Sequence, residues 1–303
     1  MSTLPVNASL EAVIVPRISD IGGFEVRRAL PSKARQMVGP FIFFDQMGPT
    51  EFLTGDGIDV KPHPHIGLGT ITYLFKGAFE HRDSLGSEQM IYPGDVNWMM
   101  AGHGVTHSER TSAQMRANPH QLSGVQTWLA LPEKDEDRPA TFTHMGKAEL
   151  PLLEDTGVRT RLIMGEAWGQ RVGFSAPSSM FYADIELSAG AEVPLPDEHE
   201  DRAVYVLHGD VDVSGQTFGA HQLLVFRPKD RMSLRAGPQG ARILALGGAP
   251  LEGPRYINWN FVSASKEKLR EARRAWIDGD FEHGRFRLPQ GDDQEFIPYP
   301  TPR

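Results

Sequence analysis

Glycine and proline recur at short intervals through most of the chain, with 31 Gly and 23 Pro among 303 residues. The segments between them are short and rich in β-branched and aromatic residues, as in TITYLF (70–75), MFYADIEL (180–187) and AVYVL (203–207). Short strands separated by turns are typical of sandwiches and barrels. Alternating βαβ units would need helical stretches of about ten residues or more between the strands, and none is seen there. The sequence therefore predicts an all-β fold.

One helix is predicted near the end of the chain. Ser265 is a suitable N-cap ahead of KEKLREARRAWID, in which Leu269, Ala272, Arg273 and Trp276 follow helical spacing. Gly279 is a suitable end for this helix. The proline-rich residues that follow have little apolar periodicity and are expected to form an extended tail.

The chain is expected to contain two related barrels. The charged, proline-bounded segment PEKDEDRP (132–139) suits a surface loop near the end of a first domain. On either side of it, TYLFKG (72–77) and VYVLHG (204–209) form similar apolar strands that end in glycine. We expect domains at 1–145 and 146–285 and a tail at 286–303, with a metal site only in the first domain.

Composition excludes several classes of function. The absence of cysteine excludes disulfides, thiolate metal sites and cysteine nucleophiles. A net charge of -8 without a basic block argues against nucleic acid as a direct partner. The sequence shows no long apolar run and no targeting signal, so a membrane partner is not expected and a cytoplasmic location is.

The main chemical signal is a pair of histidines two residues apart, His63 and His65. Side chains at i and i+2 of a strand point to the same face. His107 and Glu109 repeat this spacing. Three imidazoles and one carboxylate suit Fe(II), Mn, Co, Ni, Cu or Zn. Taken alone, His63 and His65 could be a chance pairing, and His107 with Glu109 could be a surface ion pair. The presence of both pairs in one chain favours a metal site.

His103 and His107 form a rival pair with i, i+4 spacing, as in zinc proteases. Those sites need a helix and a glutamate after the first histidine, whereas glycines flank His103 here. We therefore expect His103 in a loop, as a candidate entrance residue of the site. His81, in EHRDSLG, is expected in a turn, and the other histidines are assigned structural roles.

The predicted ligands stand in longer runs that resemble the pirin family. These runs are GPFIFFDQMGP (39–49), PHPHIGLGTITYLFKGAFEHRDSLG (62–86), YPGDVNWMMAGHGVTHSE (92–109) and GVQTWLALP (124–132). The resemblance is dense over residues 18–132. It is looser over 155–285, where YVLHGDVDV (205–213) and the final helix carry it.

Resemblance to pirins implies a bicupin fold, with two β-barrels of the double-stranded β-helix type packed face to face and a short C-terminal helix. It implies one divalent metal in the N-terminal barrel, most often iron and therefore Fe(II), held by His63, His65, His107 and Glu109. Other cupins carry a glutamate ligand where Thr70 stands, so Glu109 would supply the carboxylate here. Residues 196–199 occupy the corresponding strand entry of the second half without an H-x-H pair.

Some pirins are similar in activity to quercetin 2,3-dioxygenases. This resemblance implies a flavonol-like aromatic substrate and O2, with Glu109 as the general base and carbon monoxide as a product. A metal cupin acting on another aromatic compound is a related possibility. The alternative is a metal- or redox-dependent regulatory protein that acts through protein partners, because such a sensor would need the same four ligands. The default expectation for two packed barrels is a monomer.

Overall fold

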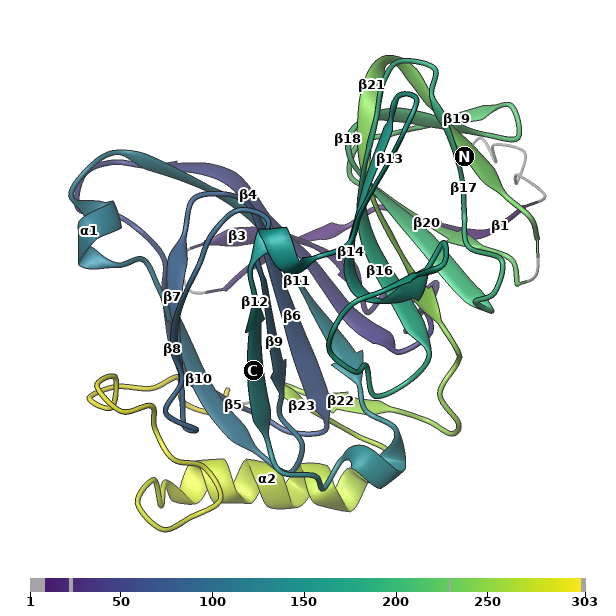
Figure 1. The fold of residues 1–303 in the computed structure, drawn as a ribbon. Helices are drawn as coiled ribbons and strands as arrows, with labels where there is room; N and C mark the ends of the chain where they lie inside the picture. Colours follow the sequence, from purple (N-terminus) through teal and green to yellow (C-terminus); the bar gives the residue numbers. More distant parts are fainter. Residues whose placement is uncertain (1–8, 22–23, 229, 301–303) are drawn as a thin grey trace. The chain divides into compact units, whose positions relative to one another are not determined.

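The computed structural model describes residues 9–21, 24–228 and 230–300, and the chain forms two compact units. Unit 1 contains the chain up to Arg17, Arg27–Phe44 and Ala148–Leu251. Unit 2 contains Ile18–Val26, Asp45–Lys147 and the chain from Glu252 onwards. Both units are built from antiparallel strands, as expected for an all-β chain (Figure 1). The domain division at residues 145 and 285 stays a prediction.

Two sheets carry most of unit 2, and of the larger one only residues 17, 27–30 and 41–44 are assigned to unit 1. The larger sheet has seven strands in the order β12 (Thr141–Met145), β9 (Val96–Met100), β6 (Leu68–Lys76), β11 (His120–Ala130), β4 (Phe41–Phe52), β3 (Glu25–Leu30) and β2 (Arg17–Asp20). The smaller has four, in the order β5 (Asp59–His65), β10 (Val105–Arg110), β7 (Phe79–Asp83) and β8 (Glu88–Ile91). Short helical turns follow some of these strands: α1 (Ala113–Arg116) after β10, η1 (Glu133–Asp135) after β11 and η2 (Lys147–Glu149) after β12.

The inner faces of these two sheets meet in an apolar core. Met47, Leu74 and Leu122 from the larger sheet pack with Phe79 and Ile91 from the smaller sheet. Every one of these side chains is buried. The segment predicted as a strand at 70–75 lies within β6, which is buried over residues 68–74 and pairs with β9 and β11. These apolar contacts thus join the two sheets.

The last part of the chain adds a hairpin and a helix to unit 2. The hairpin pairs β22 (Tyr256–Asn258) with β23 (Phe261–Ser263), and the helix is α2 (Lys266–Asp278). Figure 1 shows α2 beside β23, which it contacts. As predicted, the Ser265 side chain accepts from the Lys268 backbone N–H, and Gly279 ends the helix with a φ of 68°. No helix among the described residues is long and apolar enough to cross a membrane.

The buried face of α2 follows the predicted spacing except at Arg273, which is exposed. Leu269, Ala272 and Trp276 are buried and pack with Ile66 and Phe286. Phe286 comes from the segment that follows the helix, where residues 286–300 form no helix or strand. This tail is nevertheless attached to unit 2. The Trp276 indole N–H donates to the carbonyl of Ile297 at 3.0 Å, and the Ile297 N–H donates to the carbonyl of Pro62 in β5 at 2.9 Å.

The segment at 132–139 differs from the expected surface loop. Asp135 and Glu136 are buried, at 3% and 2% exposed surface. The Glu136 carboxylate accepts from the Ser263 hydroxyl at 2.7 Å and from the Ala264 N–H at 2.8 Å, just ahead of α2. A buried carboxylate is tolerated when hydrogen bonds satisfy it. These partners are about 130 positions away along the chain, so the local composition gave no sign of them.

Unit 1 contains a ten-stranded sheet. Its main path is β1 (Leu10–Ile14), β20 (Gln222–Phe226), β18 (Asp201–Val213), β21 (Ser233–Gly248), β16 (Met180–Leu187), β14 (Val158–Ala167) and β13 (Leu152–Asp155). Three short strands pair beside this path: β15 (Gln170–Arg171), β17 (Glu192–Pro194) and β19 (Gln216–Gly219). The segments predicted as strands at 180–187 and 203–207 are β16 and the start of β18.

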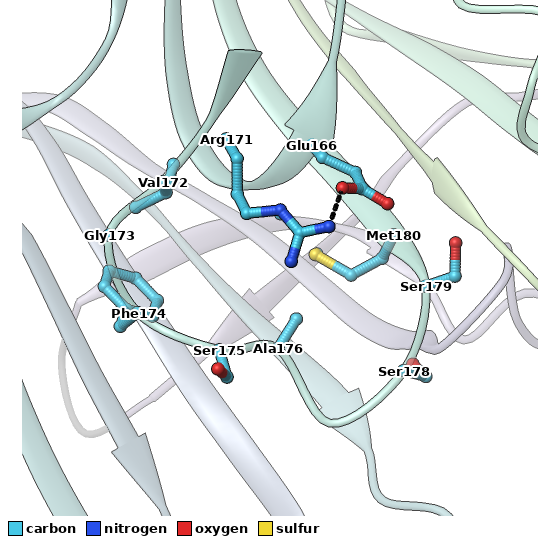
Figure 2. A pocket seen from close by; sticks show the side chains of 11 residues that line it. Glu166, Arg171, Val172, Gly173, Phe174, Ser175, Ala176, Ser178, Ser179 and Met180 are labelled. Carbon is cyan, nitrogen blue, oxygen red and sulfur yellow. Dashed lines mark hydrogen bonds and ion pairs between the residues drawn. The ribbon is translucent and has the colours of Figure 1, made fainter. Parts of the chain in front are cut away.

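A cavity of about 370 Å³ lies in unit 1 where the β14–β15 hairpin faces the segment leading to β16. Figure 2 shows the Arg171 guanidinium beside the carboxylate of Glu166, its neighbour on the same hairpin, with which it forms an ion pair. The remaining lining comes from residues 172–176 and 178–180 and from Gly165. These side chains are mostly small or polar, and the only opposite charges among them pair with each other.

Substitution of Trp276 tests the anchoring of α2. Trp276→Ala removes a side chain that is 1% exposed, and large aromatic truncations of this kind cost about 3–5 kcal/mol. Ile277→Ala is the matched control, because Ile277 is 56% exposed and should change the free energy of unfolding by less than about 0.5 kcal/mol. Urea unfolding followed by circular dichroism measures both. Equal losses in the two variants would contradict the packing described.

Candidate metal centre

The candidate site is built on three neighbouring strands of the smaller sheet of unit 2. β10 lies between β5 and β7. His107 on β10 is opposite His63 on β5 and opposite Asp83 on β7, and Glu109 is opposite His81. Directly opposed residues point to the same face of a sheet. Because of this register, the side chains of three i, i+2 pairs point into the space between the two sheets: His63 and His65, His81 and Asp83, and His107 and Glu109.

The structure brings His63, His65 and His107 together. Their candidate ligand nitrogens all lie within 4.8 Å of one another. The Nε2 atoms of His65 and His107 are 3.1 Å apart, and the ring centres of His63 and His107 are separated by 4.4 Å. The three side chains are buried, and Trp128 of the larger sheet contacts the His65 ring edge-on. Their assignment as metal ligands stays a prediction.

Hydrogen bonds on the outer side of two rings define where their lone pairs point. The Nδ1 atom of His63 is 2.9 Å from the carbonyl oxygen of Lys61, and Nδ1 of His65 is 3.1 Å from that of Asn260. A carbonyl oxygen can only accept, so each Nδ1 donates and each Nε2 carries a lone pair. The lone pairs of these two histidines therefore point away from the carbonyl oxygens, and that of His65 faces Nε2 of His107 at 3.1 Å.

Burial keeps the cluster neutral. Removal from water lowers the pKa of His63 to about 4, and it lowers the pKa values of His65 and His107 well below their usual value. Two nitrogens each about 2.1 Å from one ion and at a right angle are about 3 Å apart, close to the spacing of the two Nε2 atoms. Neutral imidazoles with converging nitrogens fit a divalent transition metal.

Glu109 lies beside this cluster and has partners of its own. Its Oε1 atom accepts from the Gln126 side-chain amide at 2.8 Å and from the Thr72 hydroxyl at 3.5 Å. Burial raises the pKa of Glu109, and the hydrogen bonds from Gln126 and Thr72 oppose this rise. Donor atoms of Glu109, His81 and His107 form a second group within 4.8 Å. His107 thus belongs to both groups.

His81 is the main residue that the sequence interpretation missed. It was expected in a turn, but it lies in β7 with 3% exposed surface. Its ring stacks on Phe142 at 4.4 Å, its Nε2 is 3.0 Å from Asp83 Oδ2, and its Nδ1 is 3.4 Å from Nδ1 of His107. The signal was present, because His81 and Asp83 have the same i, i+2 spacing as the two recognised pairs.

His103 and the second half of the chain stand apart from the cluster. His103 is exposed, and its Nδ1 lies 3.1 Å from the carbonyl oxygen of Arg138. A role at the entrance of the site stays a prediction. In unit 1, His199 is buried with its Nε2 2.8 Å from the carbonyl oxygen of Glu166. The groups of metal-type donors found among the described residues both belong to unit 2.

Comparison with known sequences finds similarity along nearly the whole chain. The family described as Pirin matches residues 23–129, and the Pirin C-terminal cupin domain matches 182–282. A pirin-like protein of Caulobacter vibrioides is 45% identical over 294 residues, which cover 96% of this chain and 99% of that protein. A Pseudomonas aeruginosa protein named "Putative quercetin 2,3-dioxygenase" is 36% identical over 290 residues, covering 95% and 90%.

Solved structures show the same architecture. A quercetin 2,3-dioxygenase from Acinetobacter baumannii matches with a TM-score of 0.87 and 31% identity, over 96% of this chain and 95% of that one. A bacterial pirin from Escherichia coli, in complex with nickel(II), matches with a TM-score of 0.63 and 16% identity, over 79% and 99%. The latter likeness shows the fold alone. The prediction of an all-β chain with two cupin domains and a short C-terminal helix is confirmed.

The low pKa of His63 predicts how the metal-free protein responds to acid. The unfolded chain takes up a proton on His63 as the pH falls through 6.5, but the folded chain does so only near pH 4. The free energy of unfolding should therefore fall between these values, by roughly 3 kcal/mol from this residue over the full window. Urea unfolding of wild type and His63→Gln at pH 7 and pH 5 measures it. The same fall in both proteins would contradict the prediction.

Proposed function

This chain belongs to the pirin family, and we propose that it is a metal-dependent dioxygenase that cleaves a flavonol with O2 and releases carbon monoxide. The observation that carries the proposal is the buried cluster of three neutral imidazoles with a carboxylate beside it. The related proteins named for quercetin 2,3-dioxygenase activity indicate the reaction. The proposed location is the cytoplasm.

The proposed ligands are His63, His65, His107 and Glu109. Three nitrogens and one oxygen leave positions open on an ion that prefers five or six ligands, and we propose Fe(II) as that ion. The same donors suit nickel, which the Escherichia coli pirin binds, and also Mn, Co, Cu and Zn. When bound, the metal supplies Lewis acidity that favours the ionised form of the flavonol 3-hydroxyl.

The protein's own contribution to the reaction would be the transfer of one proton to Glu109. Hydrogen bonds from Gln126 and Thr72 hold Oε1 of Glu109, which leaves Oε2 for other contacts. The raised pKa of Glu109 brings it towards the range in which a carboxylate accepts a proton efficiently near neutral pH. We propose that Glu109 accepts the proton of the 3-hydroxyl. The ionised flavonol then takes up both atoms of O2 and yields a depside and one molecule of carbon monoxide.

Oxygen uptake tests the proposed function. Metal-loaded protein should consume O2 when quercetin is added and should release an equal amount of carbon monoxide. Other phenols in the same panel would define the substrate class. Metal-loaded protein that consumes no O2 with any flavonol would contradict the proposed reaction, because the metal, the substrate and O2 would all be present.

Glu109→Gln tests the proposed general base. The amide cannot take the proton, and general-base catalysis contributes about 10²–10⁴-fold, so kcat per bound metal should fall at least about 100-fold. Glu88→Gln is the matched control, because Glu88 lies in the same sheet but on the exposed surface. Metal content is measured alongside the rate. Wild-type turnover by metal-loaded Glu109→Gln would remove Glu109 from the base role.

A further inference from the structure

We infer that Asp83 and His81 form a hydrogen-bonded chain that positions His107 to bind the metal through Nε2. The inference rests on the proposed metal site and concerns the residues that hold His107 from behind. Asp83 and His81 lie on β7, across from the β10 residues His107 and Glu109. Both are buried, at 1% and 3% exposed surface. They are positioning residues, because they would act on the metal only through His107.

The hydrogen-bonded chain begins at the Asp83 carboxylate, which accepts from several hydrogen-bond donors. Its Oδ1 accepts from the backbone N–H groups of Leu85 at 2.9 Å and Ser87 at 3.0 Å. Its Oδ2 is 3.0 Å from Nε2 of His81. A carboxylate with two backbone donors on one oxygen is fixed in orientation, and it can only accept from His81. The proton of His81 is therefore on Nε2.

That proton determines what His81 offers on its other side. An imidazole whose proton lies on Nε2 carries a lone pair on Nδ1, and the Nε2 of His81 faces the Asp83 carboxylate. The Nδ1 atom of His81 is 3.4 Å from Nδ1 of His107, so His107 donates from Nδ1. The Nε2 atom of His107 then carries a lone pair and lies 3.1 Å from Nε2 of His65. The stacking of His81 on Phe142 holds the imidazole in the plane that this arrangement needs.

His107 differs from the two other histidines in what holds its outer nitrogen. Carbonyl oxygens of Lys61 and Asn260 accept from His63 and His65, and a carbonyl oxygen can never donate. An imidazole can accept or donate. The tautomer of His107 therefore depends on that of His81, which depends on Asp83. Partners behind metal-bound histidines typically change metal affinity by about 10–100-fold when they are removed.

Asp83→Asn should reverse the donor and acceptor roles along this hydrogen-bonded chain while keeping the size and shape of the side chain almost unchanged. The remaining Oδ1 continues to accept from Leu85 and Ser87, which places the amide NH2 against His81 Nε2. His81 must then carry its proton on Nδ1, facing the donor of His107, so His107 loses its lone pair at Nε2. Titration of metal-free protein with Co2+ and with Ni2+ should show affinity about 10–100-fold weaker than wild type. The visible spectrum of the Co2+ form reports ligation independently of activity.

Asp95→Asn is the matched control. Asp95 accepts from the backbone N–H groups of Tyr92 and Lys147, so its substitution disturbs a turn of unit 2 in a similar way. Its histidine neighbour is His144, at 3.9 Å, and not a proposed ligand. Affinity for Co2+ should stay within about twofold of wild type. A loss as large as that of Asp83→Asn would overturn the inference, because a general disturbance of the unit would then explain both.

His81→Phe provides a second test that does not depend on the folding of Asp83→Asn. Phenylalanine keeps a ring against Phe142 but offers no acceptor to His107, so Co2+ affinity should fall by a similar factor. Folding is checked by circular dichroism. Wild-type affinity in either folded variant would overturn the chain and leave the metal site intact. A wild-type protein that binds neither ion would instead contradict the proposed metal site itself.

Discussion

The whole candidate site depends on the register of β10 between β5 and β7. Side chains alternate along a strand, so a slip of one residue would turn His107 and Glu109 out of the space between the sheets. Pairing of His107 with both His63 and Asp83 prevents this slip from either side. The ladder hydrogen bonds of the backbone therefore position the site before any side chain contributes. The apolar core around Met47 and Phe79 contains residues from both sheets and holds them together.

Burial gives the cluster its chemistry and also makes demands on it. Burial lowers the pKa values of His63 and His107 and raises that of Glu109, so the imidazoles stay neutral and the carboxylate becomes more basic. Buried polar atoms also need hydrogen-bond partners. Lys61 and Asn260 satisfy two imidazoles through backbone carbonyls, and Gln126 satisfies the carboxylate from the opposite sheet. The strands that carry the proposed ligands and the residues that hydrogen-bond to those ligands therefore have to pack together.

Local spacing explains what the sequence could predict. The pairs at 63 and 65 and at 107 and 109, the strands around 70 and 180, and both caps of α2 depend on residues a few positions apart. His81 is predicted in a turn, but it lies in a strand whose charged residues pair at the sheet surface, where Arg82 binds Glu80 and Glu88. Glu136 is predicted at the surface because its segment is charged and bounded by prolines, but it is buried. A backbone carbonyl such as that of Asn260 has no residue type to recognise, so no motif could reveal it.

The hydrogen bond from His65 to the carbonyl oxygen of Asn260 joins positions that are 195 residues apart. Gly67 shows how close this contact is, since a Cβ atom there would overlap the carbonyl oxygen of Val262. The proposed ligands all lie in one stretch of the sequence, but that stretch alone does not contain every residue that orients them. A stretch from β5 to β10 moved onto another scaffold would carry every proposed ligand and leave behind the hairpin that orients one of them. Inheritance of the motif between related chains consequently requires inheritance of the distant hairpin as well.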